Sequence, residues 1–381
     1  MTDTAAQIAT AKDLLAEFEE GQALQAQRAA NLAAAVRAIV LGPPTRKVSA
    51  SWGDGVKDAT AAIQMEIDAL APTGGVVEVP AGRYMVDAVR SLTVRSGVTL
   101  SLDPSAILEA KPNSSPRYYV LRLEADAVVQ GGRVLGDRLA HTFTAGSTHE
   151  WGYGVMLSGD RCKLLDTVIA ECTGDGIGLS GDDVEVRNVV STRNRRQGMS
   201  VFAAKRARVY DSEFSHTGSL NGQAGALPMA GVDIEPDGAS AGSPAPVCED
   251  VQFINCKFLN NESAGIKSYK NNAAGSPAVI RNIRVEGCEI AGNTDGAWFS
   301  YCEGVTLDRN NVHDNKGYGL HLLLGTYTSK PIEGNEFFNN LTRISTLDRT
   351  PDKTVTGLGE NRDLKVEATA GQCVAGENTY R

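Results

Sequence analysis

Two carboxylates stand two residues apart, Asp233 and Glu235, in the segment GVDIEPDG. Val232 and Ile234 alternate with them, which predicts a strand that points both carboxylates to one face, with Cα atoms about 6.5–7 Å apart. Side-chain rotamers then span both carboxyl separations used by glycosidases, roughly 5–5.5 Å for retention and 6.5–9.5 Å for inversion. Repulsion should raise the pKa of one carboxyl and leave the other ionised, as an acid and a base require. A cation site and a solvated surface pair are the alternatives.

The next segment of the same type, GIKSY, carries Lys267 and Tyr269. Lys267 is predicted to hold a carboxylate ionised or to bind an acidic sugar, and Tyr269 to move a proton in β-elimination or C5 epimerisation. An outward Trp298 is predicted to stack on a sugar face, because an exposed tryptophan gains nothing structural. Simple cross-strand pairing of Lys267 and a loop that covers Trp298 are the alternatives. The other candidates are Asp175 as a further acid, and His321, Arg195, Arg196, Tyr153 and Phe202 as substrate-binding residues.

A repeated glycine aligns these segments with one another. The residues one and three positions after each glycine are mostly apolar, and those at positions two and four are variable. This period-2 pattern, recurring every 22 to 34 residues, predicts a solenoid with one coil per repeat. Residues at equivalent positions of successive coils should stack about 4.8 Å apart on one outer face. The repeat glycines are Gly154, Gly176, Gly198, Gly231, Gly265, Gly296 and Gly319.

Asparagine recurs in the turns of the same repeats. Asn194, Asn261 and Asn315 each lie four residues before a repeat glycine. They predict a ladder of turn amides that satisfy one another and the backbone. Cys256 and Cys288 occupy similar places in consecutive coils, and we expect buried, stacked thiols there in preference to a disulfide.

The ends of the chain depart from this repeat. Residues 5–41 show a seven-residue apolar pattern with polar Gln22 and Gln25 in its middle, which predicts an α-helical coiled coil and a homotrimer. A helix packed on its own domain is the alternative. Residues 58–70 have helical spacing and a strand is expected at 76–79, so this helix should plug the first coil. We therefore expect an N-terminal helix over 1–42, the solenoid over 43–350 and a C-terminal cap over 351–381.

Composition excludes several classes of partner. A net charge of −9 argues against nucleic acid as a partner. The sequence contains no run of 18 apolar residues, so no insertion into a membrane is predicted. The N-terminus is acidic and amphipathic, unlike a Sec-type signal peptide. No cysteine pair has zinc spacing, so no metal ligands and no cofactor are predicted, with a structural or substrate-bridging Ca²⁺ left open.

Two groups of motifs carry a family resemblance. The segments GDG, AAIQ, GGVVEVPAGRY and SGVTL, followed by GYGV, GDGIGL, QGMSV and GVDIEPDG, resemble right-handed parallel β-helix proteins of the pectate-lyase-like type, which include bacteriophage tailspike depolymerases. The resemblance covers roughly residues 50 to 345. It implies an all-β, right-handed parallel β-helix after the coiled coil. It also implies a polysaccharide partner, a place in a virion tail or baseplate, and a virion or extracellular location.

The reaction is less defined by this resemblance. CTGD around Asp175 half matches the NTD motif of polygalacturonase-like hydrolases, and no GHG motif is present. The segment NRRQG resembles a motif of alginate epimerases, whose DPH motif is absent. We expect hydrolysis of glycosidic bonds in an acidic bacterial polysaccharide by Asp233 and Glu235. The alternatives are a uronate lyase or C5-epimerase that uses Tyr269, Lys267 and His321, and a glycan-binding fibre protein without catalysis.

Overall fold

A computed structural model describes Gln22, Gln25 and residues 42–236, 245–270, 278–323, 326–328, 332–340, 364–366 and 378–380. The chain divides into two compact units, residues 1–45 and 46–381. In the first unit, Gln22 and Gln25 are helical and exposed. The rest of the predicted heptad helix lies outside the described residues, so the coiled coil and the trimer stay predictions.

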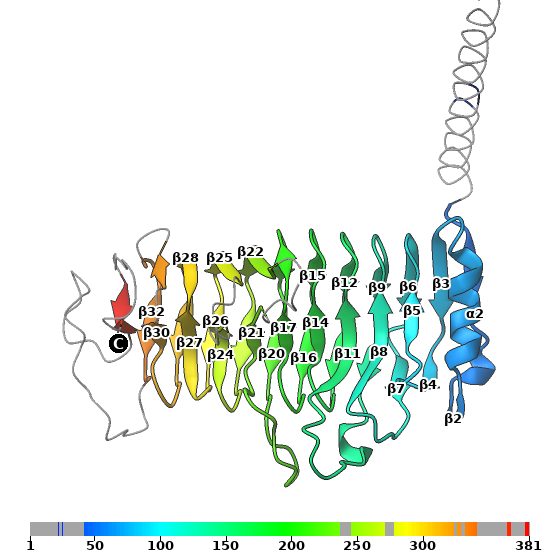
Figure 1. Ribbon diagram of the computed structural model, residues 1–381, viewed down its shortest axis with the longest axis horizontal. Helices are drawn as coiled ribbons and strands as arrows, with labels where there is room; N and C mark the ends of the chain where they lie inside the picture. The colour runs from blue at the N-terminus through cyan, green and yellow to red at the C-terminus, as the bar shows by residue number, and fades with distance from the viewer. Residues whose placement is uncertain are drawn as a thin grey trace, which may run out of the picture. The chain divides into compact units, whose positions relative to one another are not determined.

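The second unit is a stack of coils, each contributing one strand to each of three parallel sheets (Figure 1). We call the sheets A, B and C. Sheet A holds β1 (Thr45–Lys47), β3 (Gly75–Val79), β6 (Val98–Leu102), β9 (Val128–Gln130), β12 (Lys163–Leu165), β15 (Glu185–Arg187), β18 (Ala204–Lys205), β19 (Arg208–Tyr210), β22 (Val247–Ile254), β25 (Val279–Glu286), β28 (Cys302–Asp308) and β31 (Tyr327–Thr328).

Sheet B holds β2 (Asp54–Asp58), β4 (Gly82–Val86), β7 (Ala106–Ala110), β10 (Arg133–Leu135), β13 (Val168–Ala170), β16 (Val190–Thr192), β20 (Glu213–Ser215), β23 (Lys257–Leu259), β26 (Glu289–Ala291), β29 (Asn311–His313), β32 (Glu336–Phe338) and β34 (Thr379–Tyr380). Sheet C holds β5 (Leu92–Val94), β8 (Arg117–Leu123), β11 (Trp151–Leu157), β14 (Ile177–Leu179), β17 (Met199–Val201), β21 (Val232–Ile234), β24 (Ala264–Ser268), β27 (Asp295–Ser300), β30 (Leu320–Leu323) and β33 (Leu364–Val366).

The repeat glycines lie at the entrance to sheet C, and close stacking of the coils explains them. A Cβ atom on Gly198 would lie 2.5 Å from the carbonyl oxygen of Gly231, its counterpart in the next coil. Gly154, Gly265 and Gly296 lie inside their strands and not before them, which corrects the predicted starts of those strands. Extra pairs such as Ala264 with Asp295 lengthen the strands at this end.

The first coils are closed by α2 (Thr60–Leu70), which packs against β3, β5 and β6. Ile63, Ile67 and Leu70 form its buried stripe, and Figure 1 shows α2 at the end of the stack beside β3. The predicted plug helix is therefore confirmed within two residues at its start. Two short 3-10 helices, Ala50–Trp52 and Arg138–Ala140, complete the helical elements of the described ranges, in which no helix is long and apolar enough to cross a membrane.

The interior joins stacked aliphatic residues to columns of polar turn residues. Asn261 Nδ2 donates to Asn293 Oδ1 at 2.9 Å, and Asn293 Nδ2 donates to Asn315 Oδ1 at 3.0 Å. The predicted amide ladder is thus confirmed, although Asn194 bonds to the Cys172 amide and to Ser191 instead of to another asparagine. The six described cysteines are free and buried, as the stacked-thiol prediction requires.

Two strands come from the segment predicted as a cap. β33 pairs with β30 of sheet C, and β34 pairs with β32 of sheet B, so both extend the solenoid. The remainder of residues 351–381 lies outside the described residues. The boundary at residue 350 therefore stays a prediction.

Candidate active site

One row of side chains crosses the outer face of sheet C in register. Ser200 on β17 neighbours Asp233 on β21, which neighbours Lys267 on β24. Lys267 in turn neighbours Trp298 on β27, and Trp298 neighbours His321 on β30. This is the stacking that the repeated glycines predict, with adjacent strands about 4.8 Å apart.

Asp233 is the carboxyl of this row, and it is buried, with 1% of its surface exposed. Its Oδ2 lies 3.5 Å from Lys267 Nζ, while its Oδ1 has no hydrogen-bond partner among the described residues. Burial raises the pKa of Asp233 well above its ordinary value, Glu235 raises it further, and Lys267 and Arg196 oppose the rise. Asp233 is therefore suited to carry a proton at neutral pH.

Glu235 follows β21 and has the opposite environment. Arg196 Nη2 lies 2.9 Å from Glu235 Oε1 and 3.1 Å from Oε2. Gln197 Nε2 donates to Oε1 at 2.7 Å, and the Ser200 hydroxyl lies 3.2 Å from the same oxygen. Oε1 is thus crowded with donors, whereas Arg196 is the one described partner of Oε2. The carboxylate forms an ion pair and keeps one oxygen able to accept a further bond.

Arg196 joins three acidic side chains. Its Nη1 lies 2.9 Å from Asp175 Oδ2, its Nη2 bonds Glu235, and its Nε lies 3.8 Å from Glu150 Oε2. Burial would lower the pKa of Arg196, but Asp175 and Glu235 raise it above its usual value. Since the guanidinium is 11% exposed and engaged internally, Arg196 acts in this structure as a counter-ion for the acids, and its clamp on a substrate carboxylate stays a prediction.

Asp175 lies beneath this cluster, directly before β14. Its Oδ2 accepts the Ser200 hydroxyl at 2.7 Å, and its Oδ1 has no partner in the described part of the chain. Burial raises the pKa of Asp175 to about 7; Arg196 opposes this rise and Glu235 adds to it. The structure thus brings Asp175 together with Glu235, as the sequence predicted.

Aromatic side chains flank the acids on the following coils. Lys267 Nζ lies 4.6 Å above the Trp298 ring centroid and 5.7 Å from that of Tyr269. Tyr269 is 41% exposed, Trp298 is half-buried, and the His321 ring lies 5.2 Å from that of Tyr318. This side of the row therefore offers ring faces and a cation to a ligand.

Tyr153 and Phe202 form an aromatic layer on the preceding coils. Tyr153 stacks on Tyr119 at 5.4 Å and meets Phe202 edge-on at 6.1 Å between centroids. Tyr153 is 4% exposed, and burial raises its pKa, so its ring packs in this layer while its predicted contact with substrate stays a prediction. Phe202 is half-buried beside the acids and keeps part of its ring accessible.

Arg195 has structural contacts that the sequence did not predict. Its Nη1 donates to the carbonyl oxygens of Thr148, His149 and Thr173 at 3.0–3.2 Å, and its guanidinium lies 4.8 Å from the Phe143 ring. A guanidinium that holds three carbonyl groups anchors the loop before β11. Its clamp on a substrate carboxylate stays a prediction.

A family model described as a right handed beta helix region matches residues 140–283 and 278–357, more than half of the chain. The chain belongs to this right-handed beta-helix family. Two curated relatives from Bacillus subtilis (strain 168) are each 26% identical: the uncharacterized protein YclG over 86% of this chain and the SPbeta prophage-derived uncharacterized protein YorA over 51%. The chain spans 54% and 38% of their respective lengths.

Solved structures resemble this β-helix in fold. The Dettilon tailspike protein (gp208) matches with a TM-score of 0.58 and 12% identity, over 79% of this chain and 55% of that one. The A-module of the mannuronan C-5 epimerase AlgE4 from Azotobacter vinelandii gives 0.54 and 16%, over 89% and 97%. The Streptococcus pneumoniae surface adhesin PfbA gives 0.55 and 14%, over 88% and 91%. At these identities the likeness establishes the β-helix alone.

Three residues of the acid cluster, the group of side chains around Arg196, Asp175 and Glu235, were not singled out from the sequence. Ser200 occupies the position of Asp233 one coil earlier, so the register could have found it. Gln197 precedes repeat glycine Gly198 as Asp175 precedes Gly176, and this parallel was also readable. Glu150 reaches Arg196 from a loop without any repeat, and no sequence signal marks it.

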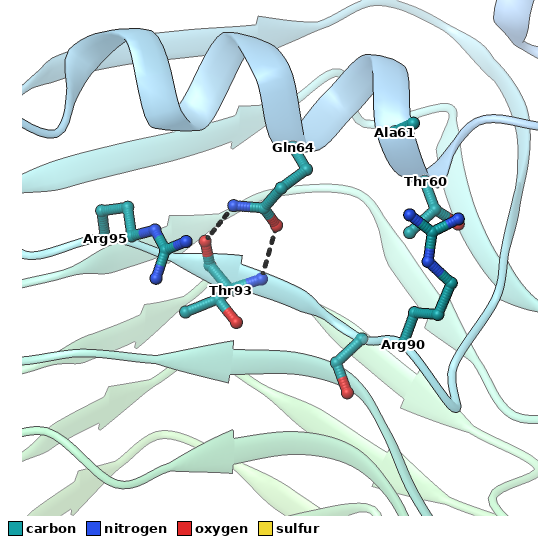
Figure 2. Close-up of a pocket in the computed structure, with 7 residues that line it drawn as sticks. Thr60, Ala61, Gln64, Arg90, Thr93 and Arg95 are labelled. Carbon is teal, nitrogen blue, oxygen red and sulfur yellow. Dashed lines mark hydrogen bonds between the residues drawn. The ribbon is translucent and has the colours of Figure 1, made fainter.

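A separate pocket lies at the N-terminal end of the β-helix, between α2 and β5 (Figure 2). Gln64 spans it by bonding both the amide and the carbonyl of Thr93, and Arg95 pairs with Asp68 and Glu124. Four strands of sheet C separate β5 from β21, so this pocket is remote from the acids. In the described ranges, no group of three or more His, Cys, Asp or Glu residues is placed to hold a metal ion.

Proposed function

We propose that this β-helix protein cleaves glycosidic bonds of a polysaccharide by hydrolysis, with Asp233 as the general acid. The observation that carries the proposal is the pair of unlike carboxyls on one strand end. Asp233 is buried with a raised pKa, whereas Glu235 forms an ion pair with Arg196. Glycosidases divide their two carboxyls into an acid and an ionised partner in this way.

Each carboxyl then has a defined task. Asp233 donates its proton to the leaving glycosidic oxygen, and Glu235 Oε2 faces the sugar or activates a water. Arg196, Gln197 and Ser200 hold Glu235 in place, so the carboxylate does not have to reorganise as positive charge develops on the sugar. Asp175 shares Arg196 with Glu235 and tunes the charge around it.

The substrate class follows from the side chains that cover Asp233. Asp233 is 1% exposed, and Lys267 lies between it and the Trp298 ring. An acidic sugar stacked on Trp298 would draw the Lys267 ammonium toward its own carboxylate and uncover the acid. We therefore infer an acidic polysaccharide of a bacterial surface or matrix as substrate.

A lyase or C5-epimerase is the second candidate, and one observation favours it. Lys267 Nζ lies within 5.7 Å of the exposed Tyr269 ring, so a phenol and a cation stand side by side where a uronate would bind. In that reaction Tyr269 or His321 would move the proton at C5, and Lys267 would neutralise the carboxylate. A glycan-binding protein without catalysis is the third candidate, with the same row acting as a binding surface.

We also propose that the protein acts as a homotrimer of a phage tail or baseplate at the virion surface or outside the cell. The heptad pattern of residues 5–41 supports this assembly. Sedimentation equilibrium of the full chain tests it, because a monomer would exclude both the coiled coil and the trimer.

The reaction is tested by incubating the full chain with bacterial capsules, exopolysaccharides and alginate-like glycans. Mass spectrometry should find products heavier by one water, without new ultraviolet absorbance. The variant Glu235→Gln should lose activity and keep glycan binding, while Glu249→Gln, in an ion pair with Arg281 on sheet A, should keep both. Unsaturated uronate products would overturn hydrolysis in favour of elimination, and binding without any product would favour the adhesin.

A further inference from the structure

A hydrogen-bonded series of three buried side chains and the exposed Thr144 runs through the loop between β10 and β11. His141 Nδ1 lies 2.8 Å from Asp137 Oδ2, and His141 Nε2 lies 2.7 Å from His149 Nδ1. At the far end, His149 Nε2 lies 3.1 Å from the Thr144 backbone nitrogen and 2.6 Å from its hydroxyl. Both imidazoles are buried, so every ring nitrogen is engaged inside the loop.

The Thr144 amide fixes the protonation of the whole chain. A backbone N–H can only donate, so His149 Nε2 must accept and carry no proton. Neutral His149 then holds its proton on Nδ1 and donates it to His141 Nε2. His141 therefore holds its own proton on Nδ1 and donates it to Asp137. Two neutral histidines satisfy every group in the series.

Other charged and titratable groups face this pair from neighbouring coils. Tyr118 and Thr173 donate to Asp137 Oδ1 at 2.5 and 2.8 Å, and Asn113 donates to its Oδ2 at 2.9 Å. Arg195 donates to the carbonyl of His149 and places its positive charge beside that histidine. Arg195 thus disfavours a positive charge on His149.

The loop is joined to the acid cluster at its C-terminal end. Arg195 holds the carbonyls of Thr148 and His149, and the next residue, Glu150, reaches within 3.8 Å of Arg196. At its N-terminal end the loop is anchored by buried Arg138, which bonds Gln223 at 2.7 Å and the Arg193 carbonyl at 2.8 Å. The stretch from 139 to 149 is therefore held by the histidine pair between two fixed points.

One added proton disrupts this arrangement. If His141 takes it, its Nε2–H points at His149 Nδ1–H, and His149 must move its proton to Nε2. That proton then meets the Thr144 N–H, donor against donor, and the amide loses its acceptor. If His149 takes the proton, the same two donors meet directly. Either event breaks the bond from the Thr144 amide and leaves the Thr144 hydroxyl as the one group there that can accept from His149.

We propose that His141 and His149 are positioning residues that hold the 139–149 loop against the Arg195–Arg196 turn and release it when they are protonated. Release withdraws the Thr148 and His149 carbonyls from Arg195 and the Glu150 carboxylate from Arg196. The acid cluster then loses one of the three acids around its central cation. Loop release is independent of the proposed glycosidase reaction, whereas its effect on catalysis rests on that function.

The direction of the pH effect follows from the state of His149. Burial lowers the pKa of His149, and His141 and Arg195 lower it further. The released loop exposes an ordinary imidazole with a pKa of about 6.5, so it binds a proton more readily than the closed loop does. The closed loop is therefore favoured above that value and is lost progressively as the pH falls below it.

Hydrogen–deuterium exchange of the protein tests the release of the 139–149 loop without any substrate. After correction for intrinsic rates, protection in residues 142–149 should fall about tenfold or more between pH 7.5 and pH 5.5, while β24 stays protected. His149→Gln should remove this pH dependence, since its amide cannot take up a proton in this range. His216→Gln, at an exposed position of another loop, is the matched control and should keep it.

Two outcomes would overturn the proposal. The first is equal protection of the loop at both pH values in the wild type. The second is an unchanged pH dependence in both His149→Gln and His141→Gln, and the second variant serves if the first does not fold. Where glycan cleavage is found, the acid limb of kcat/KM should move to lower pH in His149→Gln and stay in His216→Gln. If the protein cleaved no glycan, the proposed glycosidase function would be wrong. The exchange experiment would still decide whether protonation releases the loop.

Discussion

The asparagine ladder and the acid cluster stack polar side chains on neighbouring coils with opposite results. In the ladder, Asn293 Nδ2 donates to Asn315 Oδ1 at 3.0 Å, and Asn293 Oδ1 accepts Asn261 Nδ2 at 2.9 Å. The same side chain also donates to the Phe258 carbonyl. An amide carries both donors and an acceptor, so a column of identical amides satisfies itself. The ladder is buried, neutral and closed to outside ligands.

The acid cluster cannot satisfy itself in this way, because ionised carboxylates only accept. Arg196 and Lys267 supply donors, and the pKa values of Asp175 and Asp233 are raised. Even so, Asp175 Oδ1, Asp233 Oδ1 and Gln197 Oε1 have no partner in the described ranges. One stacking geometry thus produces stability where the groups are self-complementary, and reactivity where they are not.

Removing an acid should have the largest effect and should separate the two regions. Glu235→Gln and Asp233→Asn are each expected to lower kcat by roughly 10²–10⁴-fold, as loss of acid–base catalysis does. Asp233→Asn should leave the melting temperature unchanged, because the neutral amide resembles the protonated acid and adds no buried charge. Glu235→Gln should lower it, because Arg196 loses an ion-pair partner. Steady-state kinetics and calorimetry on the same samples check both parts. A melting temperature that fell with activity in Asp233→Asn would make this acid structural, like the ladder.

The ladder should respond in the reverse manner. Asn293→Ala removes the acceptor of the Asn261 backbone N–H, one of the two acceptors of Asn261 Nδ2, and the bond from Asn293 to the Phe258 carbonyl, so we expect about 3 kcal/mol lower free energy of unfolding. Glycan cleavage per folded molecule should be unchanged. Chemical denaturation measures the first and kinetics the second. Asn311→Ala, on the outer face of sheet B, is the control and should cost well under 1 kcal/mol.

This contrast also explains what the sequence could and could not predict. The ladder, the stacked thiols and the row from Asp233 to His321 all follow from a period, because equal positions of equal coils meet in space. The plug helix follows from its own helical spacing of apolar residues. Ser200 was within reach of the same reasoning. Where the repeat is kept, the sequence alone therefore predicts which residues are neighbours in space.

Side chains that reach across or beyond the repeat were not predictable in this way. Arg196 lies in a turn, and its sequence position does not tell whether the guanidinium turns inward to Asp175 or outward to a ligand. The pair His141 and His149 belongs to an irregular loop whose path no period fixes. The internal contacts of Arg195, Arg196 and Tyr153 were not predicted, because they depend on the loops and turns around these side chains.

Asp175 should make stability depend on pH. Its pKa is about 7 in the folded chain and near 3.9 when unfolded, so the folded state binds the proton more tightly. Stability is full below the unfolded value and falls as the pH rises, by about 2–3 kcal/mol between pH 5 and pH 7. Denaturant titrations across this range should show the slope in the wild type and lose it in Asp175→Asn. A variant with the undiminished slope would assign the proton to another group.

The smallest expected effect is at Lys267, where the charged row meets its aromatic neighbours. Lys267→Met keeps the chain length over Trp298 and removes the ammonium beside Asp233. Because Lys267 opposes the rise of the Asp233 pKa, its loss should raise that pKa further. The protonated acid would then persist to higher pH, so the alkaline limb of kcat should move upward.

KM for an acidic glycan should rise about tenfold, the effect of one lost charge contact worth about 1.4 kcal/mol, and KM for a neutral analogue should not. Lys257→Met, which removes an exposed ion pair with Glu289 on sheet B, is the matched control. If Lys267→Met moved the alkaline limb without changing KM, Lys267 would tune the acid alone, and the acidic sugar would have to be recognised elsewhere on the row.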